Sequence, residues 1–474
     1  MYLDINKHDS SSIAAVDDSG DELSYGSLCL FCKEFAEILS NRTLVFILSE
    51  NSIASLLGYV ACVNNHVVPL ILSCRTEKGL LDKLIEIYQP EYLWLPESMM
   101  ENCRYGEKIF GKYHYALLKT GRTSFPMYPD LSLLLPTSGT TGSPKLVRHS
   151  YENLEASALN VATLFELTSS QRAMGTLPMH YTMGLSVVSS HLLVGAMVIL
   201  SNRSLLDGEY WEMVKRYKAT SFTGVPYSYE ILTRLRFTRM RLPDMRIITQ
   251  GGGKMTEEQF RLYAEYAKNN GKKFIPTYGQ TEGTSRMAYL PHPLAQSKVC
   301  SIGIAVPNGK LSVIDDNGAE IMEPEAEGEM VYEGKNVTLG YATCGEDLIK
   351  GDENHGVLHT GDMVRRDADG CYFIIGRKKR FLKIYGLRIG LDEIETLVKE
   401  RFKTDCVCMG NDELLKIVIT AASGDDVVRF IEEKTGLFHQ CIKVIKLETI
   451  PHAESGKVDM NKLNGFCLLY TSPS

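Results

Sequence analysis

Short apolar runs that alternate with helical patterns constrain the fold of this chain more than any other feature of its sequence. Residues 44–48, 66–72 and 92–96 are runs of five to seven mostly apolar residues, which is typical of strands buried on both faces of a sheet. Helical patterns at 52–62 and 76–88 separate them. Because parallel strands need a long crossover between them, this alternation predicts βαβ units and a parallel sheet.

The alternation continues to a strand and polar loop at 273–283, and from about residue 299 the pattern changes to short strands and turns. Hairpins are expected around Asp316–Gly318 and between 359 and 377. We therefore predict an α/β fold in which mixed, mostly parallel sheets are layered with helices, followed by a small α+β segment. A boundary at the basic run Arg377–Arg380 divides the chain into an N-terminal domain, 1–378, and a C-terminal domain, 379–466.

Composition and charge exclude several classes of protein. Hydrophobic residues make up 44% and charged residues 23% of the 474 residues, as in an ordinary soluble globular protein with a large core. The net charge is −7 and no long basic run is present, so we expect no nucleic-acid partner. The longest apolar region, 185–200, is interrupted by His191 and Gly195 and is too short to span a bilayer.

The cysteines and the two ends of the chain bear on its compartment. Twelve cysteines are scattered without a disulfide framework, which favours a reducing, cytoplasmic location. The pairs Cys29/Cys32 and Cys406/Cys408 are expected to pack in the core. The polar, acidic N-terminus predicts no signal peptide. Residues 467–474 (CLLYTSPS) resemble a translated sequencing-adapter read-through, and we expect them to be a non-native tail.

The stretch from Pro136 to Lys145, PTSGTTGSPK, follows a buried apolar run and has the composition of a polyphosphate cradle. Its two glycines allow a tight turn with inward-pointing N–H groups. The hydroxyls of Thr137, Ser138, Thr140 and Thr141 add donors, and Lys145 adds a cation. The common P-loop pattern GxxxxGK[ST] is absent, since Leu146 follows the lysine. An ordinary Gly/Ser/Thr surface turn is the alternative interpretation of the same composition.

Three further polar stretches lie at strand ends or turns, where the loops of an open α/β sheet converge on a ligand crevice. Residues 277–283 (TYGQTEG) offer the flat face of Tyr278 and, at Glu282, a carboxylate suited to Mg²⁺. Residues 359–362 (HTGD) end on a carboxylate that can accept two ribose hydroxyls or cap a turn. Residues 455–457 (SGK) carry a late lysine. Each stretch taken alone is more often an ordinary loop or solvated surface.

Together and in this order, the four stretches closely resemble the motifs of the adenylate-forming superfamily, with GRKKRFLKIYGLRI at 376–389 before the last of them. That superfamily includes acyl- and aryl-CoA synthetases, peptide-synthetase adenylation domains and firefly-type luciferases, and the resemblance covers residues 20 to 464. It implies a large N-terminal domain that includes a distorted barrel, a hinge and a small mobile C-terminal domain. It also implies two half-reactions: a carboxylate attacks the α-phosphate of Mg·ATP, and a thiol then displaces AMP from the acyl-adenylate.

The resemblance implies a role for each residue that matches the superfamily's motifs. The β- and γ-phosphates of ATP would be held by Thr137, Ser138, Gly139, Thr140, Thr141, Gly142 and Lys145. The nucleoside part of ATP or AMP would be bound by Gly251, Gly252, Gly253, Tyr278, Gly279, Gln280, Asp362 and Arg377. The catalytic centre would contain Thr281, the metal ligand Glu282 and the adenylation lysine Lys457. Lys379 would be the hinge residue, and Lys383 and Gly386 would belong to the loop of the thioester step.

Two positions depart from the superfamily's pattern. Leu146 stands where a glycine often follows the lysine of the phosphate loop, and this leaves the donors of the loop intact. An arginine usually follows the late lysine within a few residues, whereas here only Lys462 does.

The segment Leu177–Val188, LPMHYTMGLSVV, resembles the gate region of acyl- and aryl-CoA synthetases and places Tyr181 or His180 at an aromatic gate. Core packing with one polar tip hydrogen-bonded is the alternative for each ring. No acidic residue lies in this segment, which disfavours an α-amino acid substrate. The expected wall of the acid pocket, 225–229 and 250–253, is partly aromatic and suits a fatty or an aromatic acid.

The expected activity is that of an AMP-forming acid–thiol ligase of the acyl-CoA synthetase type. Its cofactors would be ATP and Mg²⁺, and its partners a small carboxylic acid and coenzyme A. Loading of the phosphopantetheine of an acyl carrier protein is an alternative, and so is a catalytically silent homologue that binds nucleotide. The gate and phosphate-loop context also loosely resembles ligases of bacterial surface-polysaccharide or lipid gene clusters, which would connect the chain with fatty acid metabolism.

Overall fold

The computed structural model describes residues 1–39, 42–102, 104–136, 145–378, 380–384, 387–411, 413–453 and 457–469. They form two compact units, the first from Met1–Lys310 with Tyr332–Leu358 and the second from Leu311–Val331 with His359–Ser474. The boundary predicted near residue 378 lies within the second unit, and a movable domain beyond it stays a prediction.

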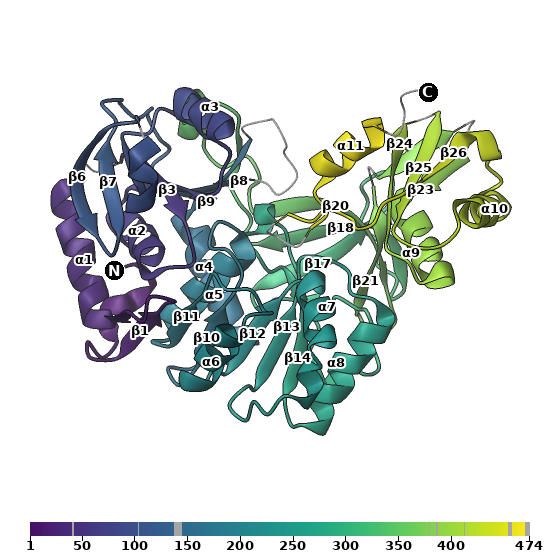
Figure 1. The fold of residues 1–474 in the computed structure, drawn as a ribbon, viewed down its shortest axis with the longest axis horizontal. Coiled ribbons are helices and arrows are strands. Elements are labelled where there is room, and N and C mark those ends of the chain that lie inside the picture. Colours follow the sequence, from purple (N-terminus) through teal and green to yellow (C-terminus); the bar gives the residue numbers. More distant parts are fainter. Residues whose placement is uncertain are drawn as a thin grey trace. The chain divides into compact units, whose positions relative to one another are not determined.

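The first unit alternates helices with strands along most of its length (Figure 1). Its helices are α1 (Tyr25–Ile38), α2 (Ile53–Asn64), α3 (Lys78–Tyr88), α4 (Tyr151–Leu164), α5 (Thr182–Leu193), α6 (Gly208–Arg216), α7 (Pro226–Arg234) and α8 (Glu257–Asn269). Its strands are β1 (Ile13–Val16), β2 (Glu22–Ser24), β3 (Leu44–Ser49), β4 (Val68–Ser73), β5 (Tyr92–Pro96), β6 (Glu107–Lys112), β7 (Tyr115–Lys119), β8 (Leu131–Pro136), β9 (Leu146–Ser150), β10 (Arg172–Gly175), β11 (Met197–Leu200), β12 (Ser221–Gly224), β13 (Ile247–Gln250), β14 (Lys273–Tyr278), β15 (Ala288–Tyr289), β16 (Ile304–Ala305) and β19 (Gly340–Ala342).

Two large sheets organise this unit. The first has the order β16-β15-β14-β13-β12-β10-β11-β1-β2 and is parallel from β14 to β1. The second has the order β19-β9-β8-β4-β3-β5-β7-β6, and its central strands β8, β4, β3 and β5 are parallel. The prediction of mixed, mostly parallel sheets layered with helices is therefore confirmed.

A shared hydrophobic core lies between the two sheets. Val45 and Ile47 of β3 and Val198 and Leu200 of β11 belong to one cluster, together with buried residues of α2 and α5. Nearly every residue of α2 is buried, because a helix between two sheets has apolar neighbours on all sides. On the other face of the first sheet, α6, α7 and α8 cover a second core.

Residues 309–377 form a further sheet, with the order β17-β18-β20-β21. Its strands are β17 (Gly309–Ile314), β18 (Ala326–Gly334), β20 (Val357–Arg366) and β21 (Tyr372–Arg377). Strands β20 and β21 form the antiparallel hairpin predicted from the sequence.

The rest of the second unit is a small α+β assembly. The strands β22 (Phe381–Ile384) and β23 (Leu387–Gly390) pair as a hairpin, and β24 (Cys406–Asn411), β25 (Leu414–Ile419) and β26 (Ile442–Lys446) form a three-stranded sheet. Helices α9 (Leu391–Phe402) and α10 (Gly424–Thr435) share its core. Cys406 and Cys408 are buried there as predicted, with their Sγ atoms 4.0 Å apart.

Helix α11 (Met460–Leu469) includes the first residues of the stretch expected to be a non-native tail. Leu463 is the sole buried residue among the positions of α11 with a described burial. The helix therefore buries no continuous apolar face, which is why the sequence shows no helical period in this segment. Within the part of the chain that the structure describes, every helix is too short or too polar to cross a membrane.

Candidate active site

Three glycines and two strand ends meet at the edge of the first sheet. Gly251–Gly253 follow β13 directly, and Thr277 and Tyr278 end the neighbouring strand β14. A Cβ atom on Gly251 would lie 2.8 Å from both the Met183 sulfur and the Thr277 hydroxyl oxygen, so the backbone is close to both neighbours only because a side chain is missing. This edge therefore holds the predicted nucleoside-binding glycines beside the Tyr278 motif.

The loop after Tyr278 is tightly folded. A Cβ atom on Gly279 would lie 1.4 Å from the Ser285 carbonyl oxygen, so glycine is required there. The side-chain amide of Gln280 donates to the Tyr278 hydroxyl at 3.0 Å. Residues Thr281–Gly283 form one turn of 3-10 helix. The turn presents Thr281 and Glu282 at the carboxyl end of β14, as the sequence predicts.

Glu282 is held by a tyrosine from a distant strand. The Tyr341 hydroxyl on β19 donates to Glu282 Oε1 at 2.8 Å, and the Thr338 amide donates to the Glu282 carbonyl oxygen at 2.9 Å. Burial, and then the neighbouring Glu282 carboxylate, raise the pKa of Tyr341 well above its usual range. Tyr341 is therefore a hydrogen-bond donor at neutral pH and orients one oxygen of the carboxylate.

Lys145 lies against the same tyrosine. Its Nζ atom is 3.3 Å from the centre of the Tyr341 ring, which is a cation–π contact. Strand β9 begins at the next residue, Leu146, which is buried and paired opposite Pro136 and Ala342. The departure from glycine at 146 thus supplies a core residue to the second sheet. One aromatic ring connects the predicted phosphate lysine with the predicted metal ligand.

The single carboxylate fits a Mg²⁺ ion that arrives with a nucleotide. Mg²⁺ keeps several waters and takes one or two carboxylates plus phosphate oxygens. Glu282 is partly exposed, and one of its oxygens is held by Tyr341. The described residues contain no cluster of three or more potential metal-ligating side chains. Glu282 stays the residue predicted to hold the ion.

The predicted gate residues lie at the start of α5. His180 is buried and Tyr181 is the residue that precedes the helix, and their ring centres are 4.4 Å apart. A Cβ atom on Gly184 would lie 2.3 Å from the Pro178 carbonyl oxygen, so the turn packs directly on the first turn of the helix. The two rings are therefore placed together by a rigid turn. The predicted role of a gate stays a prediction.

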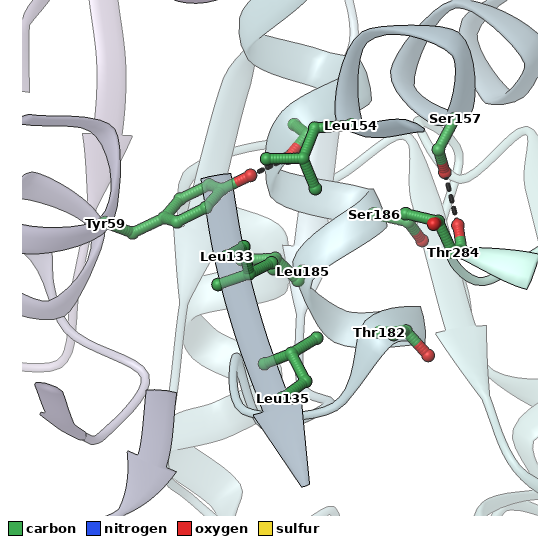
Figure 2. A pocket seen from close by; sticks show the side chains of 10 residues that line it. Tyr59, Leu133, Leu135, Leu154, Ser157, Thr182, Leu185, Ser186 and Thr284 are labelled. Atoms are coloured by element: carbon green, nitrogen blue, oxygen red, sulfur yellow. Dashed lines mark hydrogen bonds between the residues drawn. The ribbon is translucent and has the colours of Figure 1, made fainter. Parts of the chain in front are cut away.

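A narrow pocket lies next to this turn. It lies between β8 and α5 (Figure 2). Its apolar walls are leucines of β8, α4 and α5, and its polar lining is Tyr59, Ser157, Thr182, Ser186, Ser189 and Thr284. Ser157 donates to the Thr284 carbonyl oxygen, which fixes the loop that follows Glu282 to α4 (Figure 2).

The wall of the acid pocket expected from the sequence differs from this pocket. Tyr229 is fully buried in the core on the other side of the sheet, where its hydroxyl donates to the Thr249 carbonyl oxygen at 2.9 Å. Its ring packs against Tyr263 with centres 4.7 Å apart. Tyr229 therefore contributes to the core, because helix α7 turns that ring under the sheet, while Tyr227 is exposed.

The second unit brings together the two predicted ribose-binding residues. Asp362 of β20 and Arg377 of β21 are paired directly opposite each other, and Arg377 Nε lies 3.0 Å from Asp362 Oδ1. The carboxylate is buried and the guanidinium is largely exposed. Gly361, directly before Asp362 in β20, has φ of +69°, which glycine adopts without strain. The sequence placed both residues without showing that they are partners.

The lysines of the second unit are held in different ways. Lys378 Nζ pairs with Glu329 Oε2 at 2.8 Å. Lys457 is exposed, its carbonyl oxygen accepts from the Ala453 amide at 2.8 Å, and the next residue, Val458, bridges to His452. Lys457 thus lies where two chain segments pair. Lys383 lies on β22.

Several predicted site residues lie outside the described residues. They are Thr137, Ser138, Gly139, Thr140, Thr141, Gly142, Lys379 and Gly386. Their roles in phosphate binding, the hinge and the thioester step stay predictions.

Two residues that sequence reasoning missed complete the first unit's site. Tyr341 follows Gly340 in a short strand, and no local pattern connects it with Glu282. Arg286 lies four residues after Glu282. The sequence signal that could have drawn attention to it is its single charge directly before the apolar run MAYL. Arg286 is buried, and its Nη1 donates to the Ser186 hydroxyl.

Comparison with known proteins identifies the class to which this fold and site belong. The family model described as "AMP-binding enzyme" matches residues 5–342, so the chain belongs to the AMP-binding enzymes, the adenylate-forming superfamily predicted from its motifs. The predicted fold class and the predicted enzyme type, an AMP-forming acid–thiol ligase, are confirmed as well.

Individual relatives are distant. The chain is 29% identical to an indoleacetate–CoA ligase of Aromatoleum aromaticum over 364 residues, which is 72% of this chain and 69% of that protein. It is 28% identical to an oxalate–CoA ligase of Arabidopsis thaliana, over 69% of this chain and 66% of that protein. The structure of an O-succinylbenzoate–CoA synthetase from Bacillus subtilis with ATP and magnesium matches with a TM-score of 0.76 at 20% identity, over 98% of this chain and 99% of that chain.

Proposed function

We propose that the chain adenylates a carboxylic acid with Mg·ATP and transfers the acyl group to coenzyme A. The observation that carries the proposal is the contact of Tyr341 with both Lys145 and Glu282. A cation and an anchored carboxylate side by side suit a polyphosphate whose charge must be balanced as its α-phosphate is attacked. The relatives named as CoA ligases support the choice of coenzyme A as acceptor.

Each predicted residue then has a physical task. Lys145 and the hydroxyl loop at 137–144 would hold the leaving pyrophosphate, and Glu282 would hold Mg²⁺, which supplies positive charge to the phosphate oxygens when bound. Asp362 and Arg377 would bind the ribose hydroxyls. Lys457 would donate to the charge that develops on the α-phosphate and its leaving group. Because Lys457 lies on the second unit, it can be present for the first half-reaction and absent from the second.

The acid itself is proposed only by class. A fatty or aromatic acid remains the expectation from the sequence, and the absence of an acidic residue in the gate segment argues against an α-amino acid. Tyr181 and His180 would separate the acid from the incoming thiol.

Release of pyrophosphate with a panel of carboxylic acids tests the proposal. We expect acid-dependent release by the wild type, and none by Glu282→Gln. The matched control is Glu258→Gln, which changes an exposed glutamate on α8 of the same unit and is expected to leave the rate unchanged. Folded protein that binds ATP but releases no pyrophosphate with any acid would instead indicate a silent homologue.

The acceptor is tested in the second half-reaction. With an accepted acid, free coenzyme A is expected to give AMP and a thioester. Turnover with a phosphopantetheinylated carrier protein, and none with free coenzyme A, would favour the acyl carrier protein alternative.

A further inference from the structure

Arg286 places an unneutralised positive charge inside the first unit. Its side chain is 2% exposed, and no acidic side chain among the described residues forms an ion pair with it. Burial lowers the pKa of Arg286 from 12.5 to about 10, so the guanidinium is still protonated at neutral pH. The structure therefore keeps a full charge in a dry environment, where isolated charges are strongly disfavoured.

One edge of this guanidinium has no partner. Nη1 donates to the Ser186 hydroxyl, and the Phe165 ring covers one face with its centre 5.2 Å from the guanidinium carbon. Among the residues that the structure describes, neither Nε nor Nη2 has a hydrogen-bond partner. These two N–H groups lie on the same edge, and that edge binds a carboxylate through two parallel hydrogen bonds. The missing partner is thus a planar anion such as a carboxylate.

The neighbouring side chains do not supply a negative charge. Ser285 donates to Ser186 at 3.1 Å, so the surrounding groups are hydroxyls. His191 is fully buried, and burial lowers its pKa to about 4, with the charge of Arg286 acting in the same direction. His191 is therefore neutral at physiological pH. Buried polar groups are normally satisfied within the protein or by a ligand. The Nε and Nη2 atoms of Arg286 have no such partner among the described residues.

The position of Arg286 connects it with the acid to be activated. It follows Glu282 by four residues on one loop, and its partner Ser186 lines the narrow pocket at the gate helix α5 (Figure 2). That loop is conformationally constrained, with Thr284 and Ser285 at φ of 45° and 93°. Non-glycine residues adopt such angles only when the surrounding contacts impose them. A rigid segment therefore holds the guanidinium one hydrogen bond away from the pocket lining, at Ser186.

We propose that Arg286 binds a second carboxylate of the substrate, so that the acid activated by this chain is a dicarboxylic acid. The proposal rests on the proposed function and replaces the fatty or aromatic acid expected from the sequence with a small diacid. One carboxylate would be adenylated near Glu282, and the other would pair with the Nε–Nη2 edge of Arg286. The pocket is narrow and its apolar walls are leucines, which favours a small diacid with a short apolar chain over a bulky acid.

Matched pairs of acids test the proposal. Pyrophosphate release is measured with succinate against butyrate and monomethyl succinate, and with glutarate against valerate. We expect kcat/KM to favour each diacid by about ten- to a hundred-fold, as for a hydrogen-bonded charge pair. Arg286→Met is expected to remove this preference to within a factor of two. The control Arg261→Met changes an exposed arginine of α8 and should keep the preference.

A second measurement does not depend on catalysis. Succinate without ATP is expected to raise the Tm of the wild type and of R261M, but not that of R286M. R286M should fold at least as stably as the wild type, because methionine removes an unpaired buried charge. If R286M does not fold, Arg286→Lys serves in its place, since it keeps the charge but loses the two-donor edge and should reduce the preference for diacids.

The outcomes separate this inference from the proposed function. Equal use of succinate and butyrate by the wild type, or an unchanged preference in R286M, would overturn the inference while the ligase function stands. Absence of pyrophosphate release with any acid, together with an Arg286-dependent Tm shift by succinate, would refute the ligase function and support only the binding of a diacid at Arg286. Absence of both effects would refute both.

Discussion

Tyr341→Phe removes a single hydroxyl from the predicted metal site and leaves the ring in place. The lost contact is the 2.8 Å hydrogen bond to Glu282 Oε1. The ring remains under Lys145, whose Nζ lies 3.3 Å from its centre, so the phosphate lysine keeps its position. The substitution therefore isolates the orientation of the carboxylate.

The size of the effect follows from the charge on the acceptor. A hydrogen bond to a charged group contributes about 1.5–3 kcal/mol, and about 1.4 kcal/mol corresponds to a factor of ten. If the bond holds Glu282 in the geometry that binds Mg²⁺, its loss weakens the apparent Mg²⁺ affinity by roughly ten- to a hundred-fold. Losses of this size are typical when a residue that hydrogen-bonds to a metal ligand is replaced. Burial and Glu282 raise the pKa of Tyr341, so the effect should be constant across neutral pH.

The assay is a Mg²⁺ titration of acid-dependent pyrophosphate release at saturating ATP. Tyr88→Phe is the matched control, because the Tyr88 hydroxyl donates at 3.0 Å to the carbonyl oxygen of Ala342, the residue after Tyr341. Y88F is expected to lower Tm without changing the Mg²⁺ midpoint. An unchanged midpoint in folded Y341F would refute the reasoning that Tyr341 orients the metal ligand.

Three further predictions concern the second unit, the support of β19 and the pH dependence of stability. Lys457→Ala should abolish adenylate formation and retain most thioester formation from supplied acyl-adenylate. Lys462→Ala should affect neither step. Equal loss of both steps in K457A would contradict a role of Lys457 in the first half-reaction alone. Arg148→Met should lower the free energy of unfolding by several kcal/mol. The buried guanidinium donates to the carbonyl oxygens of Leu339, Tyr341, Lys350 and Gly351 and pairs with Glu353, and each buried carbonyl oxygen left without a donor costs about 1–3 kcal/mol. A melting temperature no lower than that of Arg172→Met would contradict this. Burial lowers the pKa of His149 from 6.5 to about 3, so below pH 6.5 the unfolded chain binds a proton that the folded chain does not, and stability should fall with decreasing pH by about 1.4 kcal/mol per unit from this group. His149→Gln should reduce that slope in urea titrations between pH 4 and 6.5, and an unchanged slope would show that His149 is not its source.

Much of the architecture was predictable because it is encoded in local patterns. The apolar runs at 44–48 and 92–96 became β3 and β5, and the helical periods between them became α2 and α3. Each of these patterns spans only a few residues, and their hydrophobic period matches the geometry of the element that they form. The exception is Tyr229, which the sequence placed in the acid pocket and the structure places in the core, because the rotation of a short helix is not visible in a short aromatic segment.

The sequence by itself also determined the chemistry of the site, since Glu282, Lys145 and Asp362 lie in short motifs whose residue types suit phosphates, Mg²⁺ and ribose. Only the tertiary structure decided which residues face them. Tyr341 reaches Glu282 across 59 positions of the chain, and Arg286 reaches Ser186 across 100. Such contacts depend on the order of strands in the sheets and on the packing of α5 against the loop after β14, and no local pattern records either. The charge that Arg286 brings into the interior is visible only once its neighbours are known.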